Sequence, residues 1–76
     1  MIIRAARDLH AGDIVTHDPD HDRDVRWRVQ APPKLTAFGV AQFDYTDLAD
    51  GSRGTAWFDA LARLPVEPAA WLERAR

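Results

Sequence analysis

The segment from His17 to Asp24 concentrates side chains that could bind a metal ion. Its aspartates have the alternate spacing of a calcium-binding loop, at Asp18, Asp20 and Asp22. Such a loop needs glycine at its sixth position and glutamate at its twelfth, and these positions hold Arg23 and Val29. The sequence therefore predicts no calcium site.

Two histidines of the same segment, His17 and His21, have the spacing that would place both on one face of a helix. Pro19 lies between them and disfavours a helix, so the imidazoles lack the fixed geometry of a transition-metal site. We interpret the segment as a mobile, solvated hairpin loop that binds no metal tightly, and we expect no cofactor.

Residues for nucleophilic catalysis are few. Ser52 is the only serine, and it lies in a predicted turn rather than in the strand–elbow–helix context of a serine hydrolase. His10 and several aspartates could form a catalytic group with Ser52 only if the fold brought them next to it, and one sequence does not show whether it does. We expect a protein that is not an enzyme, and a small metal-dependent or hydrolytic enzyme is the second alternative function.

Arg26 and Arg28 flank Trp27 on a predicted strand. Guanidinium groups beside aromatic rings can bind nucleic acid through phosphate contacts and base stacking. Alternate side chains of a strand point to opposite faces, however, so Trp27 should face the core while the arginines face solvent. The net charge of −2 gives no basic excess. Cross-strand pairing with aspartates explains the arginines better, and nucleic-acid binding is the first alternative function.

Trp57 and Phe58 are neighbours, so in a strand they point to opposite faces. We expect Phe58 in the core and Trp57 on the outer face. Exposed aromatic rings on a small domain are typical anchors for a protein partner. The candidate binding residues are Trp57 and Tyr45 at the centre, with Arg26 and Arg28 at the rim. Coverage of Trp57 by the carboxy-terminal segment, through Trp71 and Leu72, is the competing explanation.

Short strands must position these side chains. Met1 to Arg4 is predicted as a first strand, and Gly12-Asp13 as a turn that leads into a second strand at Ile14. Residues 24–30 alternate cleanly between apolar and polar side chains, which is the strongest strand signal in the chain. Pro32-Pro33 ends that strand, because proline cannot donate to a β-ladder.

The run from Leu35 to Leu48 is predicted as one extended run whose alternation changes phase beside Gly39. A bulge or bend there would let one long strand serve two sheets of a barrel. The alternation across the predicted strands gives a core made of Ile14, Val25, Trp27, Val29, Phe38, Phe58 and Leu64.

The last third of the chain begins with a hairpin turn over residues 50–54. Strands are expected at residues 55–58 and 62–66, the second of them cut by Pro65. Pro68 and the spacing of the apolar residues after it predict a short helix over residues 68–76.

Seventy-six residues make a single domain near the lower size limit for a stable hydrophobic core. The chain has no cysteine, which excludes disulfides and fits the cytoplasm. No apolar run could span a bilayer and no signal peptide is visible, so we expect a cytoplasmic protein that enters no membrane. Abundant alanine, arginine and aspartate are typical of a GC-rich coding sequence, such as that of an actinobacterium or its phage.

Residues 6–67 form a string of predicted short strands with an early turn, and the residues that mark it are Asp8-Leu9-His10-Ala11-Gly12-Asp13-Ile14-Val15, Trp27-Arg28-Val29, Pro33-Lys34-Leu35-Thr36-Ala37-Phe38, Leu48, Gly51 and Trp57-Phe58. This pattern resembles SH3-like β-barrels, and in particular the KOW-type amino-terminal barrel of elongation factor P. In that family a lysine between glycines is modified and reaches into the ribosome. Lys34 falls at the comparable place but is flanked by Pro33 and Leu35, so the resemblance implies the layout and not the role in translation.

The sequence thus predicts a mainly β protein, with an SH3-like barrel of about five strands over residues 1–67 and a helix over residues 68–76 packed on it. The leading function is a non-catalytic binding or assembly module. It would contact a protein partner or form a homo-oligomer. Many KOW and SH3-like barrels bind nucleic acid, which is why that function is the first alternative.

Overall fold

The computed structural model describes residues 1–69, which form seven strands and one short 3-10 turn. The elements are β1 (Ile2–Ala5), η1 (Ala6–Asp8), β2 (Ile14–Asp18), β3 (Arg23–Val29), β4 (Lys34–Leu35), β5 (Val40–Asp47), β6 (Arg53–Asp59) and β7 (Arg63–Glu67). Pro68 and Ala69 belong to neither a helix nor a strand. The rest of the helix predicted over residues 68–76 lies outside the described residues.

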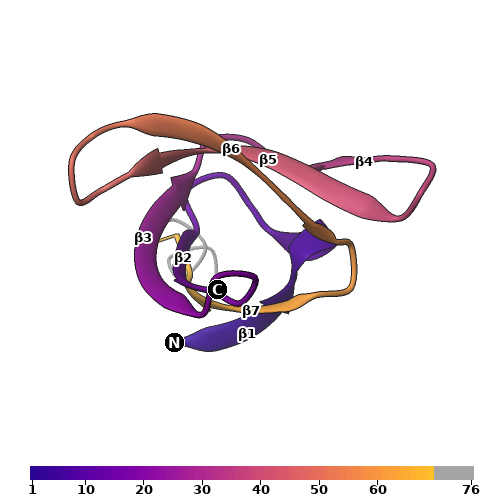
Figure 1. Ribbon diagram of the computed structural model, residues 1–76, viewed down its shortest axis with the longest axis horizontal. Helices are drawn as coiled ribbons and strands as arrows, with labels where there is room; N and C mark the ends of the chain where they lie inside the picture. The colour runs from indigo at the N-terminus through magenta and orange to yellow at the C-terminus, as the bar shows by residue number, and fades with distance from the viewer. Residues whose placement is uncertain (70–76) are drawn as a thin grey trace.

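The sheet curls into a half-barrel. Its strands pair antiparallel in the order β1-β7-β2-β3-β5-β4, and β6 pairs with the other edge of β5. Figure 1 shows β4, β5 and β6 in one layer and β1 and β7 in the opposite one, with β2 and β3 curving between them. A mainly β, barrel-like domain is therefore confirmed, with seven strands within residues 1–69 in place of about five.

Strand β5 is the centre of the sheet because it uses both of its hydrogen-bonding edges. On one edge the Thr36 N–H donates to the Val40 carbonyl (2.9 Å) and the Gln30 N–H to the Asp44 carbonyl (2.9 Å). On the other edge the Asp47 N–H donates to the Ser52 carbonyl (2.7 Å). Even-numbered residues of β5 thus bond the β3 and β4 side, and odd-numbered residues bond β6.

The run from Leu35 to Leu48 is not one long strand. The chain reverses between β4 and β5, and Gly39 closes the turn with a φ of 76°, which glycine adopts without a steric penalty. The predicted bulge or bend at Gly39 is therefore wrong, because the change of phase marks a hairpin turn. Phe38 lies in this turn and is 93% exposed, so its assignment to the core is wrong as well.

The concave face of the half-barrel holds the core. Its predicted members Trp27, Val29, Phe58 and Leu64 are buried. Ile14 and Val25 are only partly buried, and on β2 the next residue, Val15, takes the buried position. Further buried apolar residues include Ala6, Leu9, Ala41, Phe43, Ala56 and Val66. The sequence offered two alternating sets of residues for this run, and the set with Ala41 and Phe43 is the one that faces the core.

Pro65 does not cut the last strand, since β7 runs through it. The ladder between β2 and β7 covers only two pairs, Ile14 with Glu67 and Val15 with Val66. Pro65 lies just past that ladder, where its carbonyl accepts a hydrogen bond from the Thr16 hydroxyl (3.3 Å). At this position no ladder hydrogen bond to β2 needs a backbone N–H from β7, so the strand tolerates a proline, which has no N–H.

The carboxylate of Asp13 ties the two ends of the described chain together. Its side chain is fully buried and accepts hydrogen bonds from the backbone N–H groups of His10 (2.9 Å) and Ala69 (3.1 Å). The Arg4 Nε atom of β1 lies 3.2 Å from the same carboxylate. One side chain thereby holds β1, the turn before β2 and the segment after β7 in place.

Replacement of Asp13 should therefore be costly. We expect Asp13→Ala to lower the free energy of unfolding by about 3–5 kcal/mol, because it leaves the Arg4 charge and two N–H groups without their partner. Urea denaturation followed by circular dichroism measures the change. Asp8→Ala is the control, since Asp8 is exposed and faces only Arg7 at 3.9 Å. Equal stability of the two variants would contradict the assigned role.

Candidate functional site

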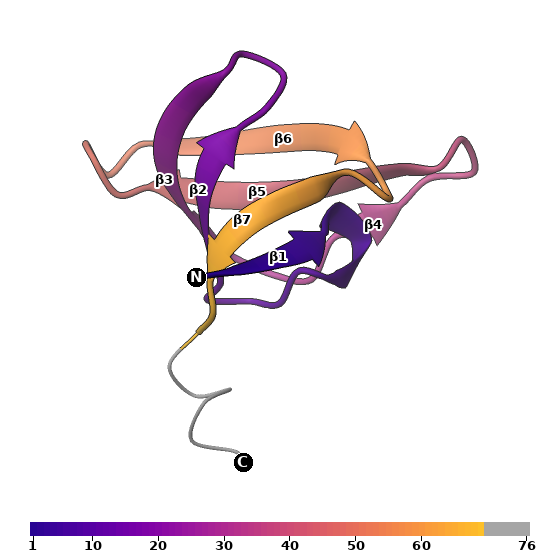
Figure 2. The same ribbon diagram turned by 90° about the horizontal axis from the view of Figure 1, so that it is seen from below.

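Strand β6 has an unpaired edge, since within residues 1–69 it pairs only with β5. Its even-numbered residues bond β5, as the Asp47–Ser52 hydrogen bond shows. The odd-numbered residues Arg53, Thr55 and Trp57 therefore turn their backbone N–H and C=O groups toward the open edge. Asp59 follows the same alternation, but its carbonyl accepts a hydrogen bond from the Ala62 N–H (2.9 Å) and is not free for a further strand. Figure 2 shows β6 lying beyond β5.

The β2–β3 hairpin lies beside this edge. It is longer than predicted, because β2 continues to Asp18 and β3 begins at Arg23. The turn between them is only Pro19 to Asp22, and Asp22 adopts a φ of 46°, which aspartate tolerates better than most residues. The prediction that all of residues 17–24 form a loop is therefore wrong at both ends.

A cleft of about 230 Å³ separates the hairpin from β6. Residues Thr55 to Phe58 of β6 border it on one side, and Asp18, His21 and Arg23 of the hairpin border it on the other. The rings of Trp27 and Tyr45 also line it. The cleft thus combines aromatic rings with a charged rim directly beside an unpaired strand edge.

The aromatic part of the cleft is held by stacking. The rings of Tyr45 and Trp27 lie 4.2 Å apart between centroids, at 19° to each other. The Tyr45 ring also covers Gly54, its neighbour across the β5–β6 ladder. A Cβ at Gly54 would lie 2.5 Å from the Tyr45 hydroxyl oxygen and 2.6 Å from the ring carbon that carries it. Glycine is therefore required at this position for the stack to form.

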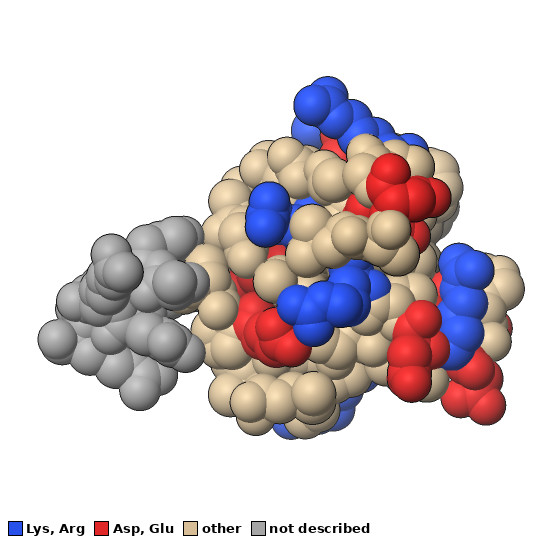
Figure 3. Space-filling view, turned by 90° about the vertical axis from the view of Figure 1, so that its left-hand side faces the viewer, with Lys and Arg blue, Asp and Glu red and all other residues tan. Residues whose placement is uncertain are grey.

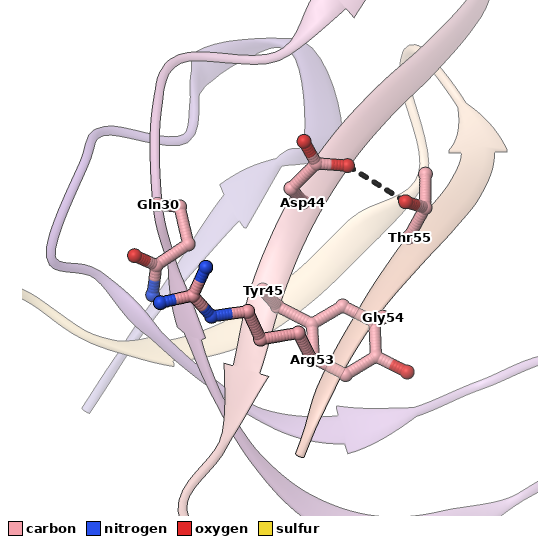
Figure 4. A pocket seen from close by; sticks show the side chains of 6 residues that line it. All are labelled: Gln30, Asp44, Tyr45, Arg53, Gly54 and Thr55. Carbon is pink, nitrogen blue, oxygen red and sulfur yellow. Dashed lines mark hydrogen bonds between the residues drawn. The ribbon is translucent and has the colours of Figure 1, made fainter. Parts of the chain in front are cut away.

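A second, shallower pocket of about 370 Å³ is bordered by β5, β6 and Gln30. Figure 4 shows the Arg53 guanidinium directed toward Gln30, while the Thr55 hydroxyl donates a hydrogen bond to Asp44 (2.7 Å). Arg53 forms no ion pair with any residue among 1–69. Its charge is therefore available at the start of the β6 edge.

The two aromatic residues of the predicted binding site lie on different faces of the sheet. Trp57 is 58% exposed and points outward, as the alternation predicts. Tyr45 points to the concave face and packs against the core with Trp27. Both border the cleft, but the sheet separates their side chains, so they do not form one aromatic patch.

The two arginines of the predicted site lie on β3, away from Trp57 in the strand order. Arg26 pairs with Glu67 through two hydrogen bonds of 3.1 and 3.2 Å. Arg28 is exposed and stands opposite Thr46 of β5 and Ile14 of β2. Figure 3 shows basic and acidic side chains next to one another over this side of the molecule. The predicted pairing of these arginines with facing aspartates is therefore not found, because Arg26 pairs with a glutamate of β7 and Arg28 has no ion pair among residues 1–69.

The histidines of the hairpin pair with different carboxylates. His17 lies 3.4 Å from Asp22 and 3.3 Å from Asp24, whereas His21 contacts Asp18 at 2.9 Å. Within residues 1–69 no three His, Asp or Glu side chains are grouped so that they could hold a metal ion.

The residues considered for catalysis have separate partners. The Ser52 backbone N–H donates to Asp50 (2.8 Å), whereas the imidazole of His10 lies 3.6 Å from Asp13. No hydrogen bond joins the Ser52 hydroxyl to an imidazole in the part of the chain that the structure describes. That part also has no helix of the length and apolarity needed to cross a bilayer.

Asp18 is the buried charge of the hairpin. Burial of its carboxylate raises the pKa, but the hydrogen bonds from His21 and the Asp20 N–H, and the charges of His21 and Arg23, outweigh that effect. The pKa of Asp18 therefore lies below its ordinary value of 3.8. A depressed carboxyl pKa stabilises the folded state above the pKa of the unfolded chain, and this stabilisation is lost as the pH falls through the folded value.

We therefore expect the stability advantage of the wild type over Asp18→Asn to shrink as the pH falls below about 4. Urea denaturation over a pH series measures this difference. Asp20→Asn is the control, because the carboxylate of Asp20 is exposed. A difference that does not change down to pH 2 would show that the Asp18 carboxylate is not stabilised in its charged form.

Gly54→Ala should disturb the stack that lines the cleft. We expect the free energy of unfolding to fall by about 1–3 kcal/mol, because the Tyr45 ring must move away from Trp27. Near-ultraviolet circular dichroism should change with it. In a Tyr45→Ala background the same glycine substitution should cost much less, as a double-mutant cycle would measure. An unchanged cost in that background would rule out the clash with the ring.

Comparison with protein-family models, with curated proteins and with solved structures found no significant match. No family is therefore assigned to this chain. Its candidate site is defined by geometry: the unpaired edge of β6, the exposed Trp57 beside it and the aromatic cleft between β6 and the β2–β3 hairpin.

Proposed function

We propose that this protein is a non-catalytic assembly module of the cytoplasm that binds a protein strand at the open edge of β6. The observation that carries the proposal is the unpaired edge of a seven-residue strand with an exposed tryptophan, Trp57, near its centre. In strand addition, main-chain hydrogen bonds supply affinity and side-chain contacts supply specificity. Trp57 and the cleft are the features that would contact those side chains.

The lack of protection at this edge among residues 1–69 supports the proposal. Natural proteins block unpaired edges with proline, lysine, bulges or very short strands. Strand β6 has none of these, and its charges, Arg53 and Asp59, stand only at its two ends. The other end strands of the sheet are shorter: β1 has four residues and carries Arg4, and β4 has two residues and begins with Lys34. Of the three, β6 is the edge suited to pairing.

The cleft gives a reason for selectivity. Alternate side chains of an added strand would point to the concave face, where the cleft lies. Trp27, Tyr45 and Phe58 offer it apolar surface, while Asp18 and Arg23 offer charge at the rim. An extended segment that directs apolar side chains to the concave face fits the aromatic part of this lining.

We also propose that the half-barrel is a variant of the SH3-like barrel. The turn at Gly12-Asp13, the strand after it and the β2–β3 hairpin follow in the order that the resemblance implies. Lys34 is the first residue of β4 and pairs with Gln42, so it is not at the tip of a loop. This position gives no support to the ribosomal role of the comparable lysine in elongation factor P.

Trp57→Ala tests the proposal. We expect the variant to lose partners that the wild type captures from its native host, while its melting temperature stays within a few degrees, because an exposed side chain contributes little to the core. Quantitative mass spectrometry of the captured proteins is the measurement.

Phe38→Ala is the control for this experiment, since Phe38 is an exposed aromatic residue in the turn between β4 and β5 and is not part of β6. Its captured proteins should match those of the wild type. Identical captured proteins for Trp57→Ala and the wild type would remove β6 as the binding edge.

A further inference from the structure

We infer that the strand which pairs with β6 is β6 of a second copy of this chain, aligned antiparallel so that Arg53 of each copy faces Asp59 of the other. This inference rests on the proposed strand addition at the β6 edge. It follows from three properties of β6, namely which backbone groups face the edge, where its charges stand and where its small residues stand.

The direction of the backbone groups restricts the pairing of β6 with itself. Edge-facing residues must oppose edge-facing residues for hydrogen bonds to form. A two-fold axis at Thr55 places Arg53 opposite Trp57, and an axis at Trp57 places Thr55 opposite Asp59. Only an axis at Ala56 brings the two charged ends of β6 together.

The charges favour the axis at Ala56. In that register Arg53 faces Asp59 of the second copy at one end, and the two-fold symmetry repeats the pair at the other end. Both side chains are exposed, and neither forms an ion pair with another residue among 1–69. One carboxylate oxygen of Asp59 accepts a hydrogen bond from the Leu61 N–H (2.9 Å), which leaves the other oxygen for Arg53 of the second copy. Opposite charges in directly facing positions stabilise an antiparallel pair, whereas like charges destabilise it. The strand is thus complementary to itself in one register.

Side-chain sizes agree with the same register. On the concave face Gly54 would stand opposite Phe58 of the second copy, and Ala56 opposite Ala56. These are positions that do not exchange hydrogen bonds across the new pair, where facing residues approach most closely, so small residues fit there. On the outer face Trp57 would lie over Thr55 of the second copy. The pairing would thereby cover a tryptophan that is 58% exposed in the single chain.

Charge reversal tests the register. We expect the wild type to sediment as a dimer with a measurable dissociation constant. Arg53→Asp and Asp59→Arg should each raise that constant about tenfold or more, because each creates two like-charge pairs. An equimolar mixture of the two variants should form heterodimers with the affinity restored, because one variant then has Asp at both positions and the other has Arg at both, so each facing pair joins opposite charges. Arg63→Asp is the control, because Arg63 lies on β7 between β1 and β2.

A cysteine at the axis provides a second measurement. The chain has no cysteine, so Ala56→Cys introduces a single thiol. In the inferred dimer the two thiols face each other at a spacing that a disulfide can bridge, and mild oxidation should give a covalent dimer. Ser52→Cys, in the β5–β6 turn and off the axis, should stay largely monomeric. Circular dichroism melts identify any variant that does not fold, and the charge variants test the register independently of the cysteine.

The outcomes distinguish this inference from the proposed function. A wild type that stays monomeric at all concentrations, with Trp57→Ala losing a captured partner, overturns self-pairing and retains strand addition. A dimer that ignores charge reversal and forms no disulfide at Ala56→Cys also overturns the inference, because its interface lies elsewhere. A charge-sensitive dimer that Ala56→Cys cross-links supports the inference, and it supports strand addition at β6 with a second copy as the partner. Unaltered capture by Trp57→Ala counts against the proposed function only where the wild type is also monomeric.

Discussion

The architecture depends on the use of both edges of β5. A strand turns the N–H and C=O groups of successive residues to alternate sides, and β5 gives one side to β3 and β4 and the other to β6. The same alternation sends Ala41, Phe43 and Tyr45 to the concave face. Strand β6 takes the second edge of β5, and among residues 1–69 no strand pairs with the other edge of β6. The core and the exposed strand edge thus follow from one constraint.

A domain of this size buries little apolar surface, and this chain has no disulfide to add to it. The fully buried carboxylate of Asp13 compensates by joining three segments that are distant in the sequence. Such a group stabilises only while its partners are present, because a buried charge without them is costly. The fold therefore rests on a polar contact as well as on the apolar face of the sheet.

The half-barrel leaves aromatic surface that its own core does not cover. Tyr45 is only partly buried although it stacks on Trp27, and Trp57 is exposed on the other face of the same sheet. The cleft that Tyr45 lines and the tryptophan are both next to the edge at which β6 has no neighbour among residues 1–69. A strand added there would place alternate side chains beside Trp57 on the outer face and at the cleft on the concave face. This is the physical basis for proposing an assembly module.

Local patterns in the sequence determined the strand character of residues 23–29, the turns around Gly12 and Gly51 and the outward direction of Trp57, because each depends on neighbours along the chain. Tertiary structure decided the rest. It placed Asp13 in the interior, made Gly39 a hairpin turn, and separated Tyr45 from Trp57. Alternation tells which residues of one strand share a face, but not which strand lies beside it. That choice depends on hydrogen bonds between residues far apart in the sequence, and so does the edge that is left open.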